Sequence, residues 1–161
     1  MERTTATIDD AGRLLGLVPH GLYLVGVSTG AERFLYTASW LTQASFTPRL
    51  IVTAVRRDHR GHRLIGEAGA FAVSFLGRDR QDLAEHGFRA GGDRLEGLPW
   101  HPCPVTGAPV VEAALGYLGC RVVRWLEGGD HDLVLAEVVT GELFNEDDLL
   151  TVAMTPWSYG G

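Results

Sequence analysis

The amino-acid sequence predicts a mainly β domain, a small β-barrel or sandwich decorated with short helices. Apolar and β-branched segments outnumber helical segments, and the expected helices are too few and too short for a doubly wound parallel sheet. At 161 residues the chain has the length of one ordinary domain, and no repeat or interdomain linker divides it. We therefore expect residues 1–161 to form a single domain.

The N-terminal third is expected to hold one helix and three strands. A short helix over residues 11–15 follows two aspartates that suit its positive end, and Pro19-His20-Gly21 stops it. The apolar run 22–27 is bounded by turn residues, which predicts a strand buried on both faces. Further strands are expected at residues 34–41 and 50–55, with a hydroxyl-rich turn at 44–48 between them.

The rest of the chain is expected to add two short helices and three strands. The helices are predicted at 62–69, closed by Gly69, and at 79–86, ending at Gly87. Residues 89–109 are rich in Pro and Gly and predict a loop. The strands are expected at 71–76, 116–125 and 131–143, the last two joined by a turn at 127–130.

Composition excludes several classes of function. All 14 basic side chains are arginine and none is lysine, so lysine Schiff-base chemistry and a Walker-A phosphate loop are excluded. A net charge of −6 argues against a nucleic-acid partner. Two cysteines make no disulfide framework, and the N-terminus shows no apolar signal segment. The uncharged stretch 14–31 is broken by Pro, Gly and hydroxyl residues, so no membrane span and a cytoplasmic location are expected.

A basic cluster at residues 56–63 is the first candidate site. It holds four arginines and two histidines within eight positions of an acidic protein, between a strand and a helix start. Arginine matches phosphate geometry, and a helix start adds N–H donors, which favours an anion site. A solvated, arginine-rich loop explains the same pattern.

Two further segments are candidates for ligand contacts. Small and hydroxyl residues alternate with Trp40 and Phe46, an arrangement that lets a flat ring lie close to backbone, although both aromatic side chains also suit a core. His131 lies between two aspartates at a turn. This position suits an acid/base group or a ligand contact, and it equally suits a solvated turn residue. The patterns His59-x-x-His62 and His101-x-Cys103 lack a matching second pair, so no metal site is expected.

The order of these segments is typical of one protein family. Thr-Ala-Ser-Trp and Ser-Phe-x-Pro within residues 37–48 precede the arginine-rich turn, and Gly-Asp-His at 129–131 leads into Ala-Glu-Val at 136–138. With this order and spacing, the chain resembles the flavin reductase-like family of FMN-binding split β-barrels over nearly its whole length. The resemblance also includes Leu64-Ile65, Gly69-x-Phe71-x-Val73, Gln81–Ala84, Thr106-Gly107-x-Pro109, Leu118–Cys120 and the tail Trp157–Gly160.

This resemblance implies a homodimer that holds FMN, rather than FAD, near the subunit interface and takes hydride from NADH or NADPH. It places His131, the catalytic candidate, beside the flavin ring where the nicotinamide docks. A tail residue, Tyr159 or Trp157, would cover the site. The implied cofactor-binding residues are Thr37, Ala38, Ser39, Trp40, Ala44, Ser45 and Phe46 for the ring and ribityl chain, Arg60, Gly61, His62 and Arg63 for the phosphate end, and Arg94 reaching the flavin.

Three positions depart from the family pattern. Gly61 stands where relatives commonly have threonine, Arg49 replaces the second proline after Phe, and Ser74 replaces an asparagine. Losing the threonine removes one hydroxyl donor from the expected phosphate site, for which Arg49, Arg60 or Arg63 is a substitute.

Three functions follow as alternatives. The first is an NAD(P)H:flavin oxidoreductase that supplies reduced flavin to a monooxygenase. The second is a flavoredoxin-like electron carrier that retains FMN and reacts with a protein partner. The third is a split-barrel binding domain without redox turnover.

Overall fold

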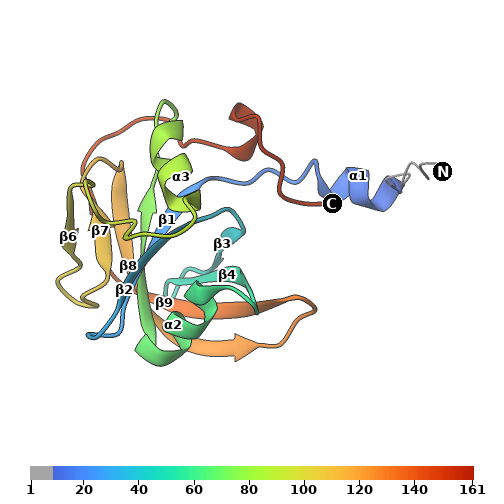
Figure 1. Cartoon of the computed structure of the whole chain (residues 1–161). Helices are drawn as coiled ribbons and strands as arrows, with labels where there is room; N and C mark the ends of the chain where they lie inside the picture. The colour runs from blue at the N-terminus through green and yellow to red at the C-terminus, as the bar shows by residue number, and fades with distance from the viewer. Residues whose placement is uncertain (1–8) are drawn as a thin grey trace.

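The computed structural model describes residues 9–161 and shows one strongly coiled antiparallel sheet with short helices around it (Figure 1). Seven strands form this sheet in the order β2-β1-β5-β8-β9-β4-β3, and a separate two-stranded sheet pairs β6 with β7. The predicted mainly β class with short helices is confirmed. The strands are β1 (Tyr23–Ser28), β2 (Arg33–Ala38), β3 (Leu41–Ser45), β4 (Leu50–Arg56), β5 (Ala70–Phe75), β6 (Trp100–Pro102), β7 (Pro109–Val111), β8 (Gly116–Leu126) and β9 (His131–Leu143), and the helices are α1 (Asp10–Leu15), α2 (Arg60–Ala68), α3 (Gln81–Phe88) and the 3-10 turn η1 (Val152–Met154).

The sheet forms an incomplete barrel because its two edge strands, β2 and β3, follow each other in the chain but do not pair with each other. β2 ends beside β1, where Ala38 pairs with Tyr23, while β3 begins beside β4, where Leu41 pairs with Thr53. The predicted single strand 34–41 is therefore wrong: the chain changes neighbours at Trp40. The carbonyl of Trp40 accepts hydrogen bonds from the Ala54 N–H (3.1 Å) and the Thr53 hydroxyl (2.9 Å), so the chain at Trp40 is already bonded to β4.

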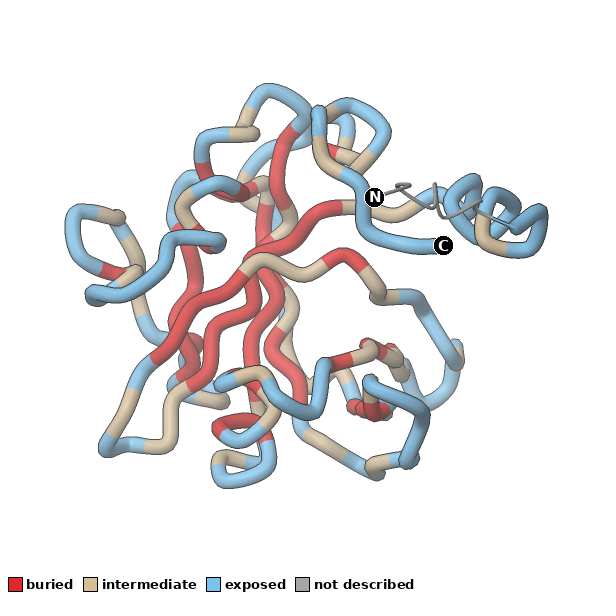
Figure 2. Tube along the Cα trace, turned by 45° about the vertical axis from the view of Figure 1, so that its right-hand side comes forward, coloured by how far each residue is buried: buried red, intermediate tan, exposed pale blue. Residues whose placement is uncertain are grey.

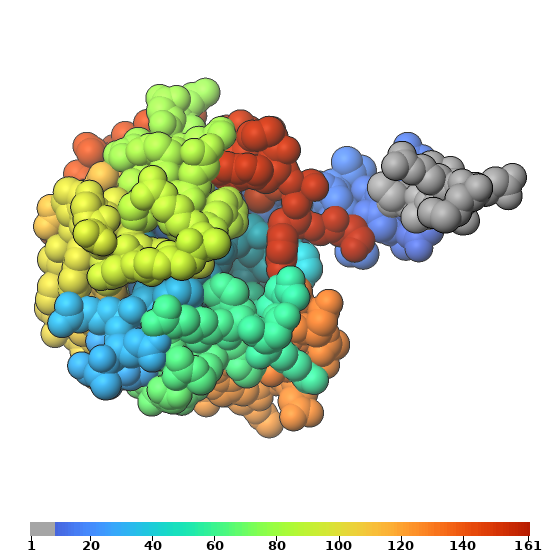
Figure 3. Space-filling view, viewed as in Figure 1, coloured from blue at the N-terminus to red at the C-terminus, as the bar shows by residue number. Residues whose placement is uncertain are grey.

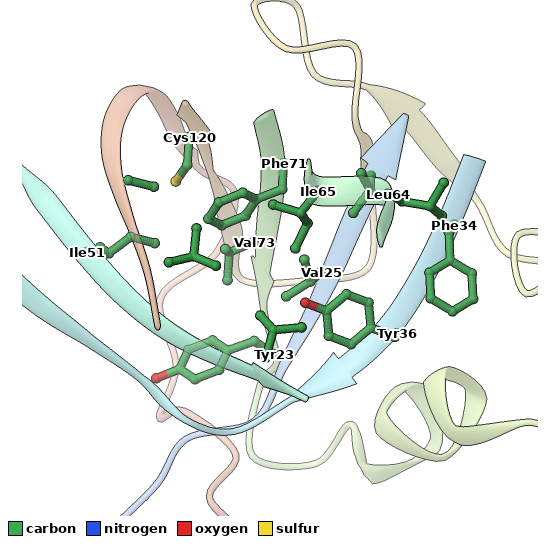
Figure 4. Close-up of a cluster of buried hydrophobic side chains, with 14 residues drawn as sticks. Tyr23, Val25, Phe34, Tyr36, Ile51, Leu64, Ile65, Phe71, Val73 and Cys120 are labelled. Carbon is green, nitrogen blue, oxygen red and sulfur yellow. The ribbon is translucent and has the colours of Figure 1, made fainter. Parts of the chain in front are cut away.

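The interior of the barrel holds the main hydrophobic core. Red, buried segments in Figure 2 follow the central strands, and the loops and α1 are exposed. In Figure 4 side chains from β1, β2, β5 and α2 converge on this core, with the Tyr36 ring among aliphatic groups. β1 is buried along most of its length, as its apolar run predicts. A second cluster, including Leu24, Leu35 and Leu83, holds α3 against β1 and β2.

All three predicted helices form, with shifted ends. α2 begins at Arg60, because the His59 side chain caps it by accepting the Gly61 N–H at 3.0 Å, and it ends at Gly69, whose φ is +66°. α3 continues past the predicted stop at Gly87. Gly87 is needed for packing because it has no side chain: a Cβ at this position would lie 2.1 Å from the Thr37 hydroxyl.

The proline- and glycine-rich segment is not entirely loop. Trp100–Pro102 pairs with Pro109–Val111, and Gly107 turns the chain between them with φ at +71°. The Ser74 hydroxyl accepts the Val111 N–H at 3.1 Å, so the departure at this position ties β5 to β7. The strands predicted at 50–55, 71–76, 116–125 and 131–143 are confirmed.

The two chain ends lie outside the barrel. α1 projects from the body and buries no residue (Figure 1). The C-terminal tail runs across the body and then turns toward α1, with Gly161 close to the Gly12 carbonyl (Figure 3). Over residues 9–161, no helix combines the length and apolarity needed to cross a membrane.

Candidate functional site

A cavity of about 260 Å³ lies where the chain passes from β2 to β3. We call it the Trp40 cavity. Strands β2, β4 and β9 form its walls, and α3 and the C-terminal tail contribute one aromatic side chain each. The cavity is lined by Leu22, Tyr36, Thr37, Ala38, Ser39, Trp40, Ala54, Val55, Arg56, His59, Phe88, His131 and Tyr159.

His131 is held in this cavity from two sides. It is the first residue of β9, and its ring lies 4.7 Å from the Trp40 ring, centroid to centroid. Nδ1 is 2.7 Å from the Asp130 carboxylate and Nε2 is 2.7 Å from the Tyr159 hydroxyl. The hydrogen bond to His131 keeps the pKa of Asp130 below its ordinary value. Only 14% of the His131 side chain is exposed, so its orientation is well defined.

Two polar atoms of this wall have no partner. Among the described residues, Trp40 Nε1 and the Tyr36 hydroxyl are the buried side-chain polar atoms without a hydrogen bond. Burial also raises the pKa of Tyr36, so its hydroxyl keeps its proton. A buried donor without an acceptor costs free energy, and a heteroaromatic ligand rich in ring nitrogens and carbonyls supplies acceptors.

The arginine-rich turn, residues 56–63, lies next to this cavity. His59 connects the turn with the cavity, because it lines the Trp40 cavity and also caps α2. Its ring centroid lies 4.7 Å from that of Tyr36. Burial and the nearby Arg94 lower the pKa of His59, which suits its role as a neutral acceptor. Gly61 is required by this packing, since a Cβ would lie 2.6 Å from the Tyr36 ring.

Carboxylates already pair the four arginines of the turn. Arg56 contacts Asp58 at 2.8 Å, Arg57 contacts Asp132 at 2.7 Å, and Arg63 contacts Glu67 at 2.8 Å. Arg60 is paired with Glu32 from the β1–β2 turn. The positive charge of this segment is therefore largely compensated within the chain.

A second, smaller cavity of about 170 Å³ adjoins Arg60. We call it the Phe34 cavity, after the ring over which Arg60 and Arg94 lie at 4.6 and 4.8 Å. The Arg94 guanidinium donates to the carbonyls of Gly87 and Leu35 at 2.8 and 3.1 Å. No carboxylate among residues 9–161 pairs with it, and burial, together with Arg60, lowers its pKa.

His62 points away from both cavities, into a network on the far side of β9. Its Nε2 lies 2.8 Å from Asp132, whose other oxygen accepts from Arg57, and its ring lies 4.8 Å from Trp125. The His62 and Arg57 hydrogen bonds lower the pKa of Asp132 to about 2. This network joins α2 to the β8–β9 hairpin.

Comparison with known proteins decides the family. The profile described as "Flavin reductase like domain" matches residues 15–155. The chain belongs to this flavin reductase-like family. An "NADH-dependent FAD reductase" of Streptomyces globisporus is 33% identical over 132 residues, which cover 80% of this chain and 72% of that protein. The solved "NADH:FAD oxidoreductase SgcE6" from the same organism aligns over 99% of this chain and 90% of its own, with 27% identity and a TM-score of 0.78.

Other relatives are much longer. The "Diflavin flavoprotein A 1" of Synechocystis sp. is 30% identical over 147 residues, which cover 89% of this chain but 26% of that protein. The chain thus spans about a quarter of the diflavin flavoproteins it matches.

The flavin reductase-like fold brings together only part of the predicted site. Thr37, Ala38, Ser39, Trp40, His131 and Tyr159 line one cavity, while Arg60 and Arg94 line the neighbouring one. The Thr37 hydroxyl is engaged by the Ala84 carbonyl at 2.7 Å. Ala44, Ser45 and Phe46 reach neither cavity within one chain, and the Phe46 side chain is 85% exposed.

Sequence reasoning missed several lining residues. Phe34 and Tyr36 lie in a predicted strand without any site pattern, and Phe88 lies at the end of α3, also without one. His59 belongs to the predicted anion cluster and to a rejected metal pattern, but its role as the cap of α2 was not predicted, because the helix was expected to begin at residue 62. The additional lining residues of the Trp40 cavity are Leu22, Tyr36, Ala54, Val55, Arg56, His59 and Phe88.

Proposed function

We propose that this protein is an NAD(P)H:flavin oxidoreductase, with residues 1–161 acting as one flavin-binding domain. The observation that carries the proposal is the Trp40 cavity, in which an ordered histidine faces a tryptophan beside two unpartnered buried polar atoms. Family membership and the relatives named as NADH-dependent FAD reductase and NADH:FAD oxidoreductase support it.

The residues present fit a flavin. The β2 backbone and the Trp40 ring form a surface on which a flat ring packs, and Trp40 Nε1, a buried donor without a partner, would find an acceptor on its polar edge. Arg60 and Arg94 at the Phe34 cavity meet the phosphate, which carries about −1.5 to −2 at neutral pH. His59 and Phe34, with ring centroids 5.8 Å apart, lie between the two ends. Bound flavin supplies the hydride acceptor, and the chain supplies binding, orientation and charge.

His131 orients the nicotinamide. Its Nδ1 is engaged by Asp130, so Nε2 is the atom that faces an incoming group when the Tyr159 hydroxyl leaves. The ring would then offer a polar contact to the nicotinamide, and the aromatic wall of Trp40 and Tyr159 would limit access of water. Tyr159 covers the cavity until the second substrate arrives.

We propose FMN as the bound flavin, although the named relatives act on FAD. The visible spectrum of the purified protein and titration with riboflavin, FMN and FAD test this directly. A colourless protein that binds none of them at micromolar concentration contradicts the proposed function.

Kinetics separate a reductase from an electron carrier. A reductase oxidises NADH or NADPH continuously when free flavin and oxygen are supplied. A carrier keeps its flavin through gel filtration and oxidises the nucleotide slowly. The non-redox alternative predicts neither behaviour.

We further propose a homodimer in the cytoplasm that supplies reduced flavin to a monooxygenase. Exposed apolar groups support self-association: Phe46 on the β3–β4 turn and Leu14, Leu15, Leu17 and Val18 in and after α1 are exposed. A cavity of about 800 Å³ beside β3 and β4 adds an incompletely covered surface. Analytical ultracentrifugation tests the dimer, cell fractionation the location, and coupled turnover with a monooxygenase the partner.

A further inference from the structure

Glu32 has an unusual position for a surface carboxylate. It lies in the turn between β1 and β2, where its backbone is anchored to Thr29: its N–H donates to the Thr29 hydroxyl at 3.1 Å, and its carbonyl accepts the Thr29 N–H at 3.0 Å. This anchoring directs the Glu32 side chain toward α2, and one third of that side chain is exposed.

The Glu32 carboxylate bridges two arginines of the arginine-rich turn. Oε2 accepts from Arg60 Nε at 2.7 Å and from Arg60 Nη2, and Oε1 accepts from Arg63 Nη2 at 3.3 Å. The hydrogen bonds from Arg60 and Arg63 keep the pKa of Glu32 below its ordinary value, so it is charged at neutral pH. Paired guanidinium donors of this kind hold a phosphate in the same way.

We propose that Glu32 competes with the flavin phosphate for Arg60 and Arg63, and that it thereby keeps flavin exchangeable instead of permanently bound. This inference rests on the proposed function, in which Arg60 and Arg94 at the Phe34 cavity meet the phosphate; Arg63 enters only because the same carboxylate also holds it. A phosphate dianion that reaches Arg60 either displaces Glu32 into solvent or lies beside its negative charge. Both outcomes weaken binding of phosphorylated flavins, and neither affects riboflavin.

Arg94 makes this competition selective. It also lies over the Phe34 ring, at 4.8 Å, donates only to backbone carbonyls and forms no ion pair among the described residues, although Asp93 lines the same cavity. The phosphate therefore retains one permanent cation at the Phe34 cavity, and Glu32 controls the second. Affinity is reduced rather than abolished.

A positioning role for Glu32 predicts the opposite change in FMN binding when the carboxylate is removed. If the carboxylate serves to hold the Arg60 and Arg63 side chains in the geometry that phosphate needs, its removal loosens them and weakens FMN binding. The direction of the change therefore distinguishes competition from positioning.

The test compares Glu32→Gln with Glu67→Gln. Both remove one negative charge beside Arg63, but Glu67 makes an i,i+4 contact within α2 and does not touch Arg60. Dissociation constants for FMN and riboflavin are measured by flavin fluorescence at low and high salt. We expect Glu32→Gln to raise the preference for FMN over riboflavin about 3- to 10-fold at low salt, less at high salt. Glu67→Gln is expected to change it less than about twofold.

Each result has one meaning. A larger FMN preference in Glu32→Gln, with riboflavin affinity unchanged, supports the competition. An unchanged or smaller FMN preference, with flavin binding intact, overturns it and leaves the proposed function standing. Binding of neither flavin by the wild-type protein overturns both. Glu32→Ala provides a second variant, and thermal unfolding verifies that each variant is folded.

Discussion

The Trp40 cavity and the arginine-rich turn lie next to each other, yet they are prepared for a ligand in opposite ways. The cavity presents an ordered histidine and two buried polar atoms that lack partners. The turn presents four arginines, each already paired with a carboxylate. One region has unused hydrogen-bonding capacity, and in the other that capacity is occupied.

The difference shows that charge counted along a sequence overestimates the charge available to a ligand. The turn holds four of the 14 arginines in a lysine-free chain, but Asp58 and Glu67 nearby in sequence, and Glu32 and Asp132 from distant segments, compensate their charge. Arg94, remote from the cluster in sequence, is the cation that remains beside Arg60. The following experiments test this contrast.

The largest effect is expected at the cavity. His131→Ala removes the ordered ring that faces the nicotinamide, so kcat/KM for NADH should fall about 10- to 100-fold, a loss of about 1.4–2.7 kcal/mol. Asp130→Asn keeps the ring and weakens one of its hydrogen bonds, so a smaller decrease is expected. Steady-state NADH oxidation with added flavin measures both, and unchanged kcat/KM in His131→Ala contradicts the catalytic assignment.

The second effect is expected at the turn. Arg60→Ala should weaken FMN binding about 10-fold, because a hydrogen-bonded cation at the phosphate is lost, and should change riboflavin affinity less than about twofold. Arg124→Ala, on β8 outside the turn, is the matched control that removes one arginine elsewhere. Equal FMN affinities for the two variants would mean that Arg60 takes no part in phosphate binding and that the turn is ordinary solvated surface.

The third prediction concerns stability and pH. The folded-state pKa of Asp132 is about 2, below its ordinary 3.8, so the charged carboxylate stabilises the fold above pH 3.8 and this contribution is lost as the pH falls from 3.8 toward 2. Asp132→Asn should lower the Tm at pH 7 by a few degrees, and the difference should shrink in that acid range. Melting curves at pH 7, 5, 3 and 2 measure it. Asp148→Asn, in an exposed pair with Arg78, should leave Tm unchanged; a pH-independent difference for Asp132→Asn would contradict the linkage.

The smallest effect is expected from the tail. Tyr159→Phe removes the hydroxyl that occupies His131 Nε2 but keeps the ring against Trp40. If Tyr159 must leave before the nicotinamide docks, KM for NADH should fall about two- to fivefold with little change in kcat. A higher KM would mean that the hydroxyl assists binding instead.

Local patterns were sufficient where the chain interacts mainly with its near neighbours. Three features were predictable: the buried strand at 22–27, the glycine at the end of α2, and the two long strands joined at residues 127–130. In each, burial or turn geometry selects a recognisable pattern of consecutive residue types. The break at Trp40 was not predictable, because it depends on hydrogen bonds that residues of β4 donate to the Trp40 carbonyl. The β6–β7 hairpin was predicted as loop because of its prolines, which lie at the ends of its short strands and do not interrupt their pairing.

The candidate site divides in the same way. The order of segments along the chain pointed to the β2 strand end, the arginine-rich turn and His131, and the fold brings the first and last of these to one cavity, together with Arg56 and His59 from the start of the turn. Glu32 and Tyr36 carry no motif, and their importance arises from the residues that pack against them. Phe46 has the motif but lies in solvent within one chain.

By itself, the sequence determined that this is a mainly β, lysine-free domain of flavin reductase-like pattern, in which any phosphate must be held by arginine, histidine, hydroxyl or N–H groups. Only the tertiary structure decided which arginines are free to do so. Pairing depends on distances between segments far apart in the chain, such as Glu32 with Arg60 and Asp132 with Arg57. A guanidinium interacts strongly only with groups within a few ångströms, so the folded arrangement, and not the count of charges, sets the affinity of the site.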